Sequence, residues 1–352
     1  MSKLPGSPNR SRFHFGNPLR AISQKNVHIP SRLLDLLKTF DETLAGRMRK
    51  LIPKNKEDVI SFEWMKVAIE SVCATHNDVK DFITDVNLPI ASWDEKWIEV
   101  YMEITLNLLD LCIAFSSEIS KMNQGNIFIQ CAVHKLTHDF PKQFIRTRSS
   151  FDNWRKTISA KNQRMENCST PLKSLKSSLD LPKVKNSPKG QILMSAMYGM
   201  KVHTLLICSV FASVFSGSHT NIMDLDVSEF PSWANLYLEL QKNVNRNLMQ
   251  VLSERQVIFQ ELNAVDLAVK KLYPIVEGTE PTSNEDHQVC LSDLKSKSER
   301  LSCVLDVLGK DVDGFFKIIL NSRDALLCGL RGSSYHKTNN SFSSNSKQQT
   351  VR

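Results

Sequence analysis

The sequence predicts an all-α fold: an elongated helical bundle with a long C-terminal antiparallel hairpin, coiled-coil-like, and disordered basic termini. Three observations support this prediction. Only 12 of 352 residues are glycine, and long alternations of β-branched residues are absent. Apolar residues recur at steps of three and four, as on one face of a helix. Near the C-terminus they repeat every seven residues, as in coiled coils.

The chain divides by composition into six predicted segments, and 41% hydrophobic residues suffice for a sizeable core. These segments are a disordered basic arm (1–30), an N-terminal helical bundle (31–170), a basic hinge (171–190), an apolar helix (191–216), a long helical hairpin (229–328) and a disordered tail (329–352).

The net charge of +8 is concentrated at the two ends of the chain. Residues 1–32 hold six Lys or Arg and 331–352 hold four, and neither segment has an acidic residue. Of the 45 basic residues, 35 therefore lie between the ends, beside all 37 acidic ones. A nearly neutral body argues against a nucleic-acid groove, whereas the basic ends suit an anionic surface.

The eight cysteines are scattered, without a Cys-x-x-Cys pair, which predicts free thiols in a reducing compartment. The N-terminal arm has four prolines and no acidic residue, so it is read either as a disordered arm or as an organellar transit peptide.

The first predicted helix begins at Ser31, a candidate N-cap, and stops at Pro53. A second predicted helix follows it. Their apolar stripes comprise Leu33, Leu36, Leu37, Phe40, Leu44, Met48 and Leu51, then Phe62, Met65, Ile69, Val72, Val79 and Ile83. His76 lies in the second stripe. It is interpreted as a structural histidine, with a ligand or base role as the alternative, because no second ligand stands at metal-binding spacing.

A third helix is predicted from a capping box of Ser92 and Glu95 to a break at residues 123–126, followed by a short helix over 127–136. Asp110 and Glu118 lie outside its apolar face and are interpreted as solvated charges, with general acid or base catalysis as the alternative. A further helix is expected to end or bend at 169–171.

His134 and His138 lie four residues apart, a spacing that also occurs in metal sites. No cysteine or carboxylate in a known motif completes a ligand set, so a surface pair is the preferred interpretation. The sequence therefore assigns no catalytic, cofactor-binding or metal-binding residue.

Val202–Phe215 is the most apolar stretch, with 14 residues against the roughly 20 needed to cross a bilayer. Two alternatives remain open. The helix is either buried in a soluble bundle or inserted into a membrane, with the preceding lysines as an interfacial anchor.

Two heptad arrays follow, and they predict a hairpin of one helix of about 40 residues ending at residues 273–274 and a second helix closed by Gly329. The first array comprises Tyr237, Val244, Val251, Ile258, Val265 and Leu272. The second comprises Leu291, Leu294, Ser298, Leu301, Leu305, Leu308, Val312, Phe315 and Ile319.

Several motifs in this chain resemble those of the plant BYPASS family, in order and over nearly its whole length. They include Phe15-Gly16-Asn17-Pro18, Trp64-Met65-Lys66, Thr75-His76, Glu95-Lys96-Trp97, Leu109-Asp110-Leu111-Cys112, Phe115-Ser116-Ser117-Glu118, Asn123-Gln124-Gly125 and Leu181-Pro182-Lys183-Val184-Lys185-Asn186-Ser187. The resemblance implies a developmental regulator that restrains production of a root-derived mobile signal, which otherwise arrests shoot growth.

Three functional hypotheses follow. The first is a non-enzymatic regulator that binds protein partners through the hairpin and contacts a membrane through Val202–Phe215 and its basic flanks. It implies an endomembrane or plastid location, with the cytoplasm as the alternative. The second is an enzyme or binder for a small apolar metabolite, with His76 and Asp110 as candidate residues. The third is a vesicle-tethering scaffold, which rests on helical shape alone.

Overall fold

The structure, a computed structural model, describes residues 29–86, 95–138, 144–179, 187–227, 231–254, 259–277 and 284–342. Across these residues the regular structure is helical and contains no strand, which confirms the all-α prediction. Predictions for residues 1–28, the capping box at Ser92, the centre of the basic hinge and the last ten residues lie outside the described part.

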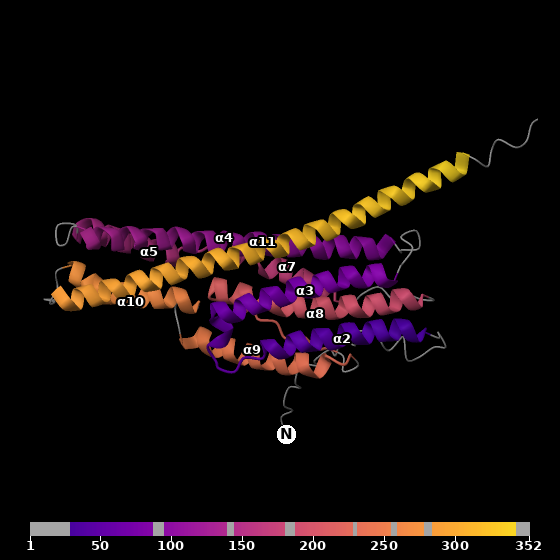
Figure 1. The fold of residues 1–352 in the computed structure, drawn as a ribbon, viewed down its shortest axis with the longest axis horizontal. Helices are drawn as coiled ribbons and strands as arrows, with labels where there is room; N and C mark the ends of the chain where they lie inside the picture. The colour runs from indigo at the N-terminus through magenta and orange to yellow at the C-terminus, as the bar shows by residue number, and fades with distance from the viewer. Residues whose placement is uncertain are drawn as a thin grey trace, which may run out of the picture.

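The main helices run roughly along one long axis, as the predicted elongated bundle requires (Figure 1). They are α2 (Ser31–Leu51), α3 (Phe62–Val86), α4 (Glu95–His138), α5 (Phe144–Ser159), α6 (Gln163–Glu166), α7 (Ser169–Ser177), α8 (Pro188–Ser216), α9 (Ala234–Glu254), α10 (Gln260–Glu277) and α11 (Asn284–Phe342). Short 3-10 turns, η1 (Asp58–Ile60) and η3 (His219–Asn221), connect some of them.

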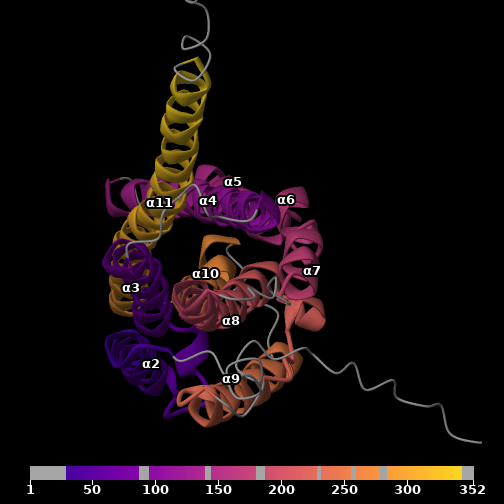
Figure 2. The ribbon, with the colours of Figure 1, turned by 90° about the vertical axis from the view of Figure 1, so that its right-hand side faces the viewer.

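Helix α8 lies at the centre of the bundle when the molecule is viewed end-on (Figure 2), and α2, α3, α4, α6, α7 and α9 pack around it. Its sequence explains this position, because a helix that is apolar on all sides needs neighbours on all sides. Every residue from Gly199 to Phe215 is buried. Ser187 caps its start by accepting a hydrogen bond from the Gly190 amide, and Gly217 ends it in the left-handed region at φ 66°.

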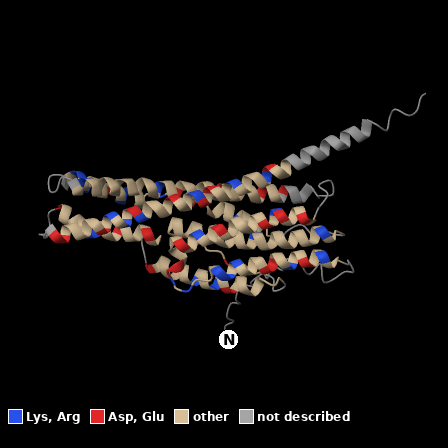
Figure 3. Cartoon of the chain, viewed as in Figure 1, with Lys and Arg blue, Asp and Glu red and all other residues tan. Residues whose placement is uncertain are grey.

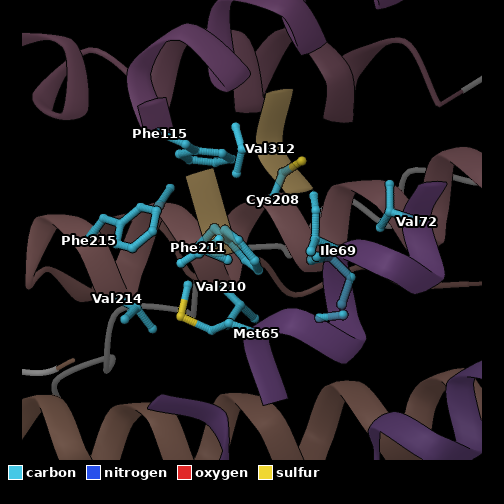
Figure 4. Close-up of a cluster of buried hydrophobic side chains, with 14 of the residues drawn as sticks. Met65, Ile69, Val72, Phe115, Cys208, Val210, Phe211, Val214, Phe215 and Val312 are labelled. Atoms are coloured by element: carbon cyan, nitrogen blue, oxygen red, sulfur yellow. The ribbon is translucent and has the colours of Figure 1, made fainter. Parts of the chain in front are cut away.

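By length and hydropathy α8 is the one described helix that could cross a membrane, yet 94% of its most apolar window is buried inside the protein. Of the two alternatives for Val202–Phe215, the structure therefore favours a core helix. Aromatic rings pack around its C-terminal half, with the Phe211 and Phe215 ring centroids 5.6 and 5.8 Å from that of Phe115 (Figure 4).

Helix α4 continues through residues 123–126, so the predicted break there is wrong. The polar residues serve contacts with other helices instead of a turn. A Cβ atom at Gly125 would lie 2.9 Å from Cδ1 of Ile158, so the glycine lets α5 approach closely. Asn126 is buried and faces Ser298 of α11.

The Asn126 and Ser298 pair is a reciprocal link between α4 and α11. The Asn126 amide donates to the Ser298 carbonyl at 2.9 Å, and the Ser298 hydroxyl donates to Asn126 Oδ1 at 2.8 Å. We expect Asn126→Ala to lower the free energy of unfolding by about 1–3 kcal/mol, because it leaves buried polar groups unsatisfied. Urea denaturation would measure the change. Gln124→Ala, an exposed change two residues earlier, should have little effect, and equal losses would contradict this explanation.

The first heptad array is divided between two helices in the described residues, so a single 40-residue helix was the wrong prediction. Helix α9 packs mainly against α2, whereas α10 packs against α11 and α5. The described residues thus give an antiparallel pair formed by α10 and the first part of α11 (Figure 1). The described members of both arrays are buried, which confirms the stripes themselves; Ile258 lies outside the described residues.

Four further helix boundaries differ from the prediction. Helix α10 continues past Pro274 to Glu277, so residues 273–274 do not end it. Helix α11 passes Gly329 and ends at Phe342, so the predicted tail is helical over its first part. Pro171 lies in the first turn of α7, where a proline is tolerated. Ser31 is the first helical residue, after Pro30.

Acidic and basic side chains are interspersed along the described helices (Figure 3). This distribution agrees with the nearly neutral body of the chain. The ends of the predicted basic hinge are helical, in α7 and the first turn of α8.

Candidate functional site

A buried polar cluster joins α3 to α8 at the centre of the bundle. His203 of α8 lies between two hydroxyls of α3, with Nε2 3.3 Å from Ser71 Oγ and Nδ1 3.5 Å from Thr75 Oγ1. The Thr75 hydroxyl donates to the Ser71 carbonyl at 2.8 Å, so it accepts from His203 Nδ1. Nε2 is then free to accept from Ser71, which fixes the neutral tautomer.

His76, the histidine that the sequence singles out, is the second imidazole of this cluster. Its Nε2 lies 3.0 Å from Thr204 Oγ1, and that hydroxyl donates to the Met200 carbonyl at 2.8 Å. The imidazole therefore donates to Thr204. The Phe315 ring packs against it edge-on, with centroids 5.1 Å apart. His76 thus links α3, α8 and α11, as expected of a structural histidine.

Burial lowers the pKa of His76 to about 4 and that of His203 to about 3, the latter with help from the nearby Arg47 guanidinium. Arg47 of α2 forms an ion pair with Asp78 of α3 and also donates to Thr75 at 3.3 Å. Both imidazoles are neutral at pH 7. Because a general base works best with a pKa near the operating pH, these values suit structural hydrogen bonding better than proton transfer.

The cavity beside His76 is too small for a metabolite. Its volume is about 10 Å³, enough for one water molecule at most. The lining residues are His76, Ile104, Leu108, Leu175, Met200, Lys201, Thr204 and Leu205. Asp110, the other candidate of the enzyme hypothesis, is exposed on α4 and does not line this cavity. The structure therefore does not bring the two candidates together there.

Glu118 is buried, which corrects its interpretation as a solvated charge. It forms an ion pair with Lys121 at 2.7 Å and accepts a hydrogen bond from the Asn162 amide at 2.9 Å. A buried carboxylate is stable only with such partners. Asn162 stands 44 residues away in the sequence, so helical spacing around Glu118 gave no sign of it.

Glu118 lines a second, much larger cleft, with a volume of about 780 Å³. It lies among α4, α5, α6, the end of α8 and the start of α10, and its lining combines apolar residues with several lysines and carboxylates. This cleft, which sequence reasoning missed, has the size of a small-molecule site.

Among the described residues, no group of three His, Cys, Asp or Glu converges as a metal site would require. His134 is exposed beside a groove between α4 and α11, and the side chain of His138 lies outside the described residues. The cysteines whose side chains are described are free, as predicted. Burial raises the pKa of Cys73, Cys168 and Cys208 to about 12, which keeps these thiols protonated.

The fold and these sites define an all-α bundle protein with a hydrogen-bonded polar centre and a separate open cleft. Comparison with known sequences identifies the family of this protein. The chain belongs to the BPS1 family, since the family described as Protein BPS1 matches residues 76–328. This confirms the family indicated by the sequence motifs and identifies the chain as a member of a plant developmental regulator family.

Relatives from two plant species support this assignment. Protein BPS1, chloroplastic, from Arabidopsis thaliana is 45% identical over 93% of this chain and 93% of its own length. UPF0496 protein 4 from Oryza sativa subspecies japonica and indica is 35% identical over 80% of this chain. The chain spans 62% of the length of these rice relatives. No solved structure matches it significantly.

Proposed function

We propose that this protein is a non-enzymatic regulator that restrains production of a root-derived mobile signal, which otherwise arrests shoot growth. The observation that carries the non-enzymatic part is the use of the central histidines as internal links. His76 and His203 each bond hydroxyls of the neighbouring helix, and the adjoining cavity holds about 10 Å³. Membership of the BPS1 family supports the developmental role.

The regulator would act by binding protein partners through the pair formed by α10 and α11. Exposed apolar side chains on this pair support the proposal: Leu267 of α10 is 48% exposed and Val289 of α11 is 67% exposed. Exposed aliphatic residues on a paired helix surface can anchor a partner helix. Binding there would leave the central polar cluster undisturbed.

The location we propose is the plastid, because the Arabidopsis relative carries the word chloroplastic in its name. Membrane contact would then be peripheral and would use the basic ends of the chain. Insertion of α8 would expose the apolar faces of the helices around it, so it is the less favourable route. Carbonate extraction of plastid membranes tests this: the native chain should be released, and retention in the membrane would contradict peripheral contact.

Complementation of a plant line that lacks the family member tests the proposed function. His76→Gln keeps a hydrogen-bond donor for Thr204, so we expect it to restore shoot growth as the native chain does. Leu267→Asp combined with Val289→Asp should fold but fail to restore growth. If the His76 variant folds normally yet fails, the cluster has a chemical role and the non-enzymatic proposal is wrong.

The exposed changes need a matched control for surface charge. Ile145→Asp combined with Met249→Asp alters two other exposed apolar residues, on α5 and α9. This control should restore growth. If both double variants fail equally, the loss reflects general surface charge and not binding at α10 and α11.

A further inference from the structure

The cleft among α4, α5, α6, α8 and α10 has the form of a ligand site. Its volume is about 780 Å³, within the range of small-molecule pockets in proteins. Four stretches that are distant in the sequence line it, at residues 118–122, 155–166, 214–221 and 259–270. It is distinct from the small cavity at His76, and Leu267 of the partner surface proposed above does not line it, although both use α10.

One part of the cleft lining is apolar. It is formed by side chains that are themselves anchored in the hydrophobic core, so their positions are fixed by packing. These residues are Met122, Met165, Val214, Phe215, Phe259 and Leu262. Such a lining suits the apolar body of a ligand.

The charged part of the lining carries one positive charge in excess. Three lysines are each paired with a carboxylate of the same cleft: Lys121 with Glu118 at 2.7 Å, Lys161 with Glu166 at 3.2 Å and Lys270 with Asp266 at 2.7 Å. The fourth cation is Arg155, whose guanidinium carbon lies 4.0 Å from the Tyr273 ring centroid.

Arg155 forms no ion pair within the described residues. Stacking on Tyr273 holds one face of its guanidinium and leaves the N–H groups at its edge suited to a carboxylate. A monoanion would therefore balance the charge of the cleft, whereas a cation would add to the excess.

The wall also carries an unsatisfied polar group. Asn221 is 3% exposed, and its amide nitrogen donates to Ser216 at 3.3 Å, but its Oδ1 has no hydrogen-bond partner in the described structure. A buried polar atom without a partner is uncommon in a folded protein. An ionised carboxylate has no hydrogen to donate to Oδ1, so the acidic group of a ligand is better placed at Arg155 than at Asn221.

We propose that this cleft binds a small amphipathic organic acid, with its apolar body against the core side chains and its single acidic group at Arg155. Calorimetric titration of the full chain with decanoate and, separately, with decylammonium tests both parts of the proposal. The two probes share the same alkyl chain and differ in charge. Decanoate should bind at least about tenfold more tightly, as expected for one charge-assisted pair with Arg155. Equal affinities, or no binding of decanoate, would overturn the proposal.

Two variants of α5 locate the site. Arg155→Gln should weaken decanoate binding about tenfold and abolish the preference over decylammonium. Arg146→Gln removes the same charge from an exposed position on the same helix outside the cleft and should bind as the native chain does. Circular dichroism and thermal unfolding confirm that both variants are folded. Equal behaviour of the two variants would contradict a site at Arg155.

An acidic amphiphile could also belong to a lipid bilayer, so a second arm distinguishes the sources. The native chain is sedimented with phosphatidylglycerol vesicles in the presence and absence of decanoate. Binding of decanoate without vesicle binding identifies a free organic acid as the ligand. Vesicle binding that persists in Arg155→Gln, together with no titration by decanoate, would assign the membrane contact elsewhere and overturn the proposal.

Discussion

Phe211→Lys is expected to abolish cooperative folding. Phe211 is 1% exposed in the middle of α8, and its ring packs between those of Phe115 and Phe215. Truncation of a core phenylalanine alone costs about 3–5 kcal/mol, and burial of an unpaired ammonium adds several more. Since domains are stable by roughly 5–15 kcal/mol, this change should exceed most or all of the available stability.

Circular dichroism and urea denaturation of the purified chain measure this effect. Ile145→Lys provides the control, because Ile145 is 86% exposed on α5 and should tolerate the charge within about 0.5 kcal/mol. The result also separates the two interpretations of α8. If Phe211→Lys gave a soluble protein with native stability, α8 would not be the core of the folded state.

Acidification from pH 6.5 to pH 4 is expected to destabilise the protein strongly through its central histidines. The pKa values of about 4 for His76 and 3 for His203 lie below the ordinary value of 6.5. In this pH range the unfolded chain binds protons that the folded chain does not, so stability falls as the pH falls. Each pKa unit corresponds to about 1.36 kcal/mol, which makes the combined loss several kcal/mol.

Urea denaturation at a series of pH values measures this dependence. His203→Gln should lower stability at pH 7 but flatten the slope between pH 6.5 and 4, because one of the two titrating imidazoles is gone. His219→Gln changes an exposed histidine of η3 and should leave the slope as it is in the native chain. An unchanged slope in His203→Gln would mean that this imidazole does not cause the acid sensitivity.

Asp41 opposes the histidines in part of this range. Burial raises its pKa from 3.8 to about 6, so the folded state favours the protonated carboxyl. Its contribution to stability increases as the pH falls from 6 toward 4. Burial also raises the pKa of Glu261 and Asp311 and lowers that of His287. The native slope therefore sums several groups, and only the variant isolates the share of His203.

Helical stripes could be predicted from the sequence because burial alternates with the period of the helix itself. Residues such as Leu305, Leu308 and Val312 are buried as their spacing requires. The continuation of α4 could not be predicted in this way. Asn126 and Gly125 favour turns locally, and only contacts with α5 and α11 explain why they remain helical.

The division between α9 and α10 escaped prediction for a related reason. A heptad stripe records that one face is buried, but it does not record which helix covers that face. Val244 and Val265 are both fully buried, yet α9 packs on α2 and α10 on α11. The open cleft could not be predicted from the sequence either, since Arg155 and Phe259 stand more than 100 residues apart and line the same cleft only in the folded chain.

The central place of α8 has a consequence for biogenesis. Helices α2 and α3 are synthesised before α8, and each presents an apolar stripe that α8 later helps to cover. During translation, or during passage through an organelle envelope, these stripes therefore remain open to water until about residue 216 is available. We expect a ribosome-stalled chain that ends before α8 to be bound by chaperones, and a chain released after α11 to be free of them.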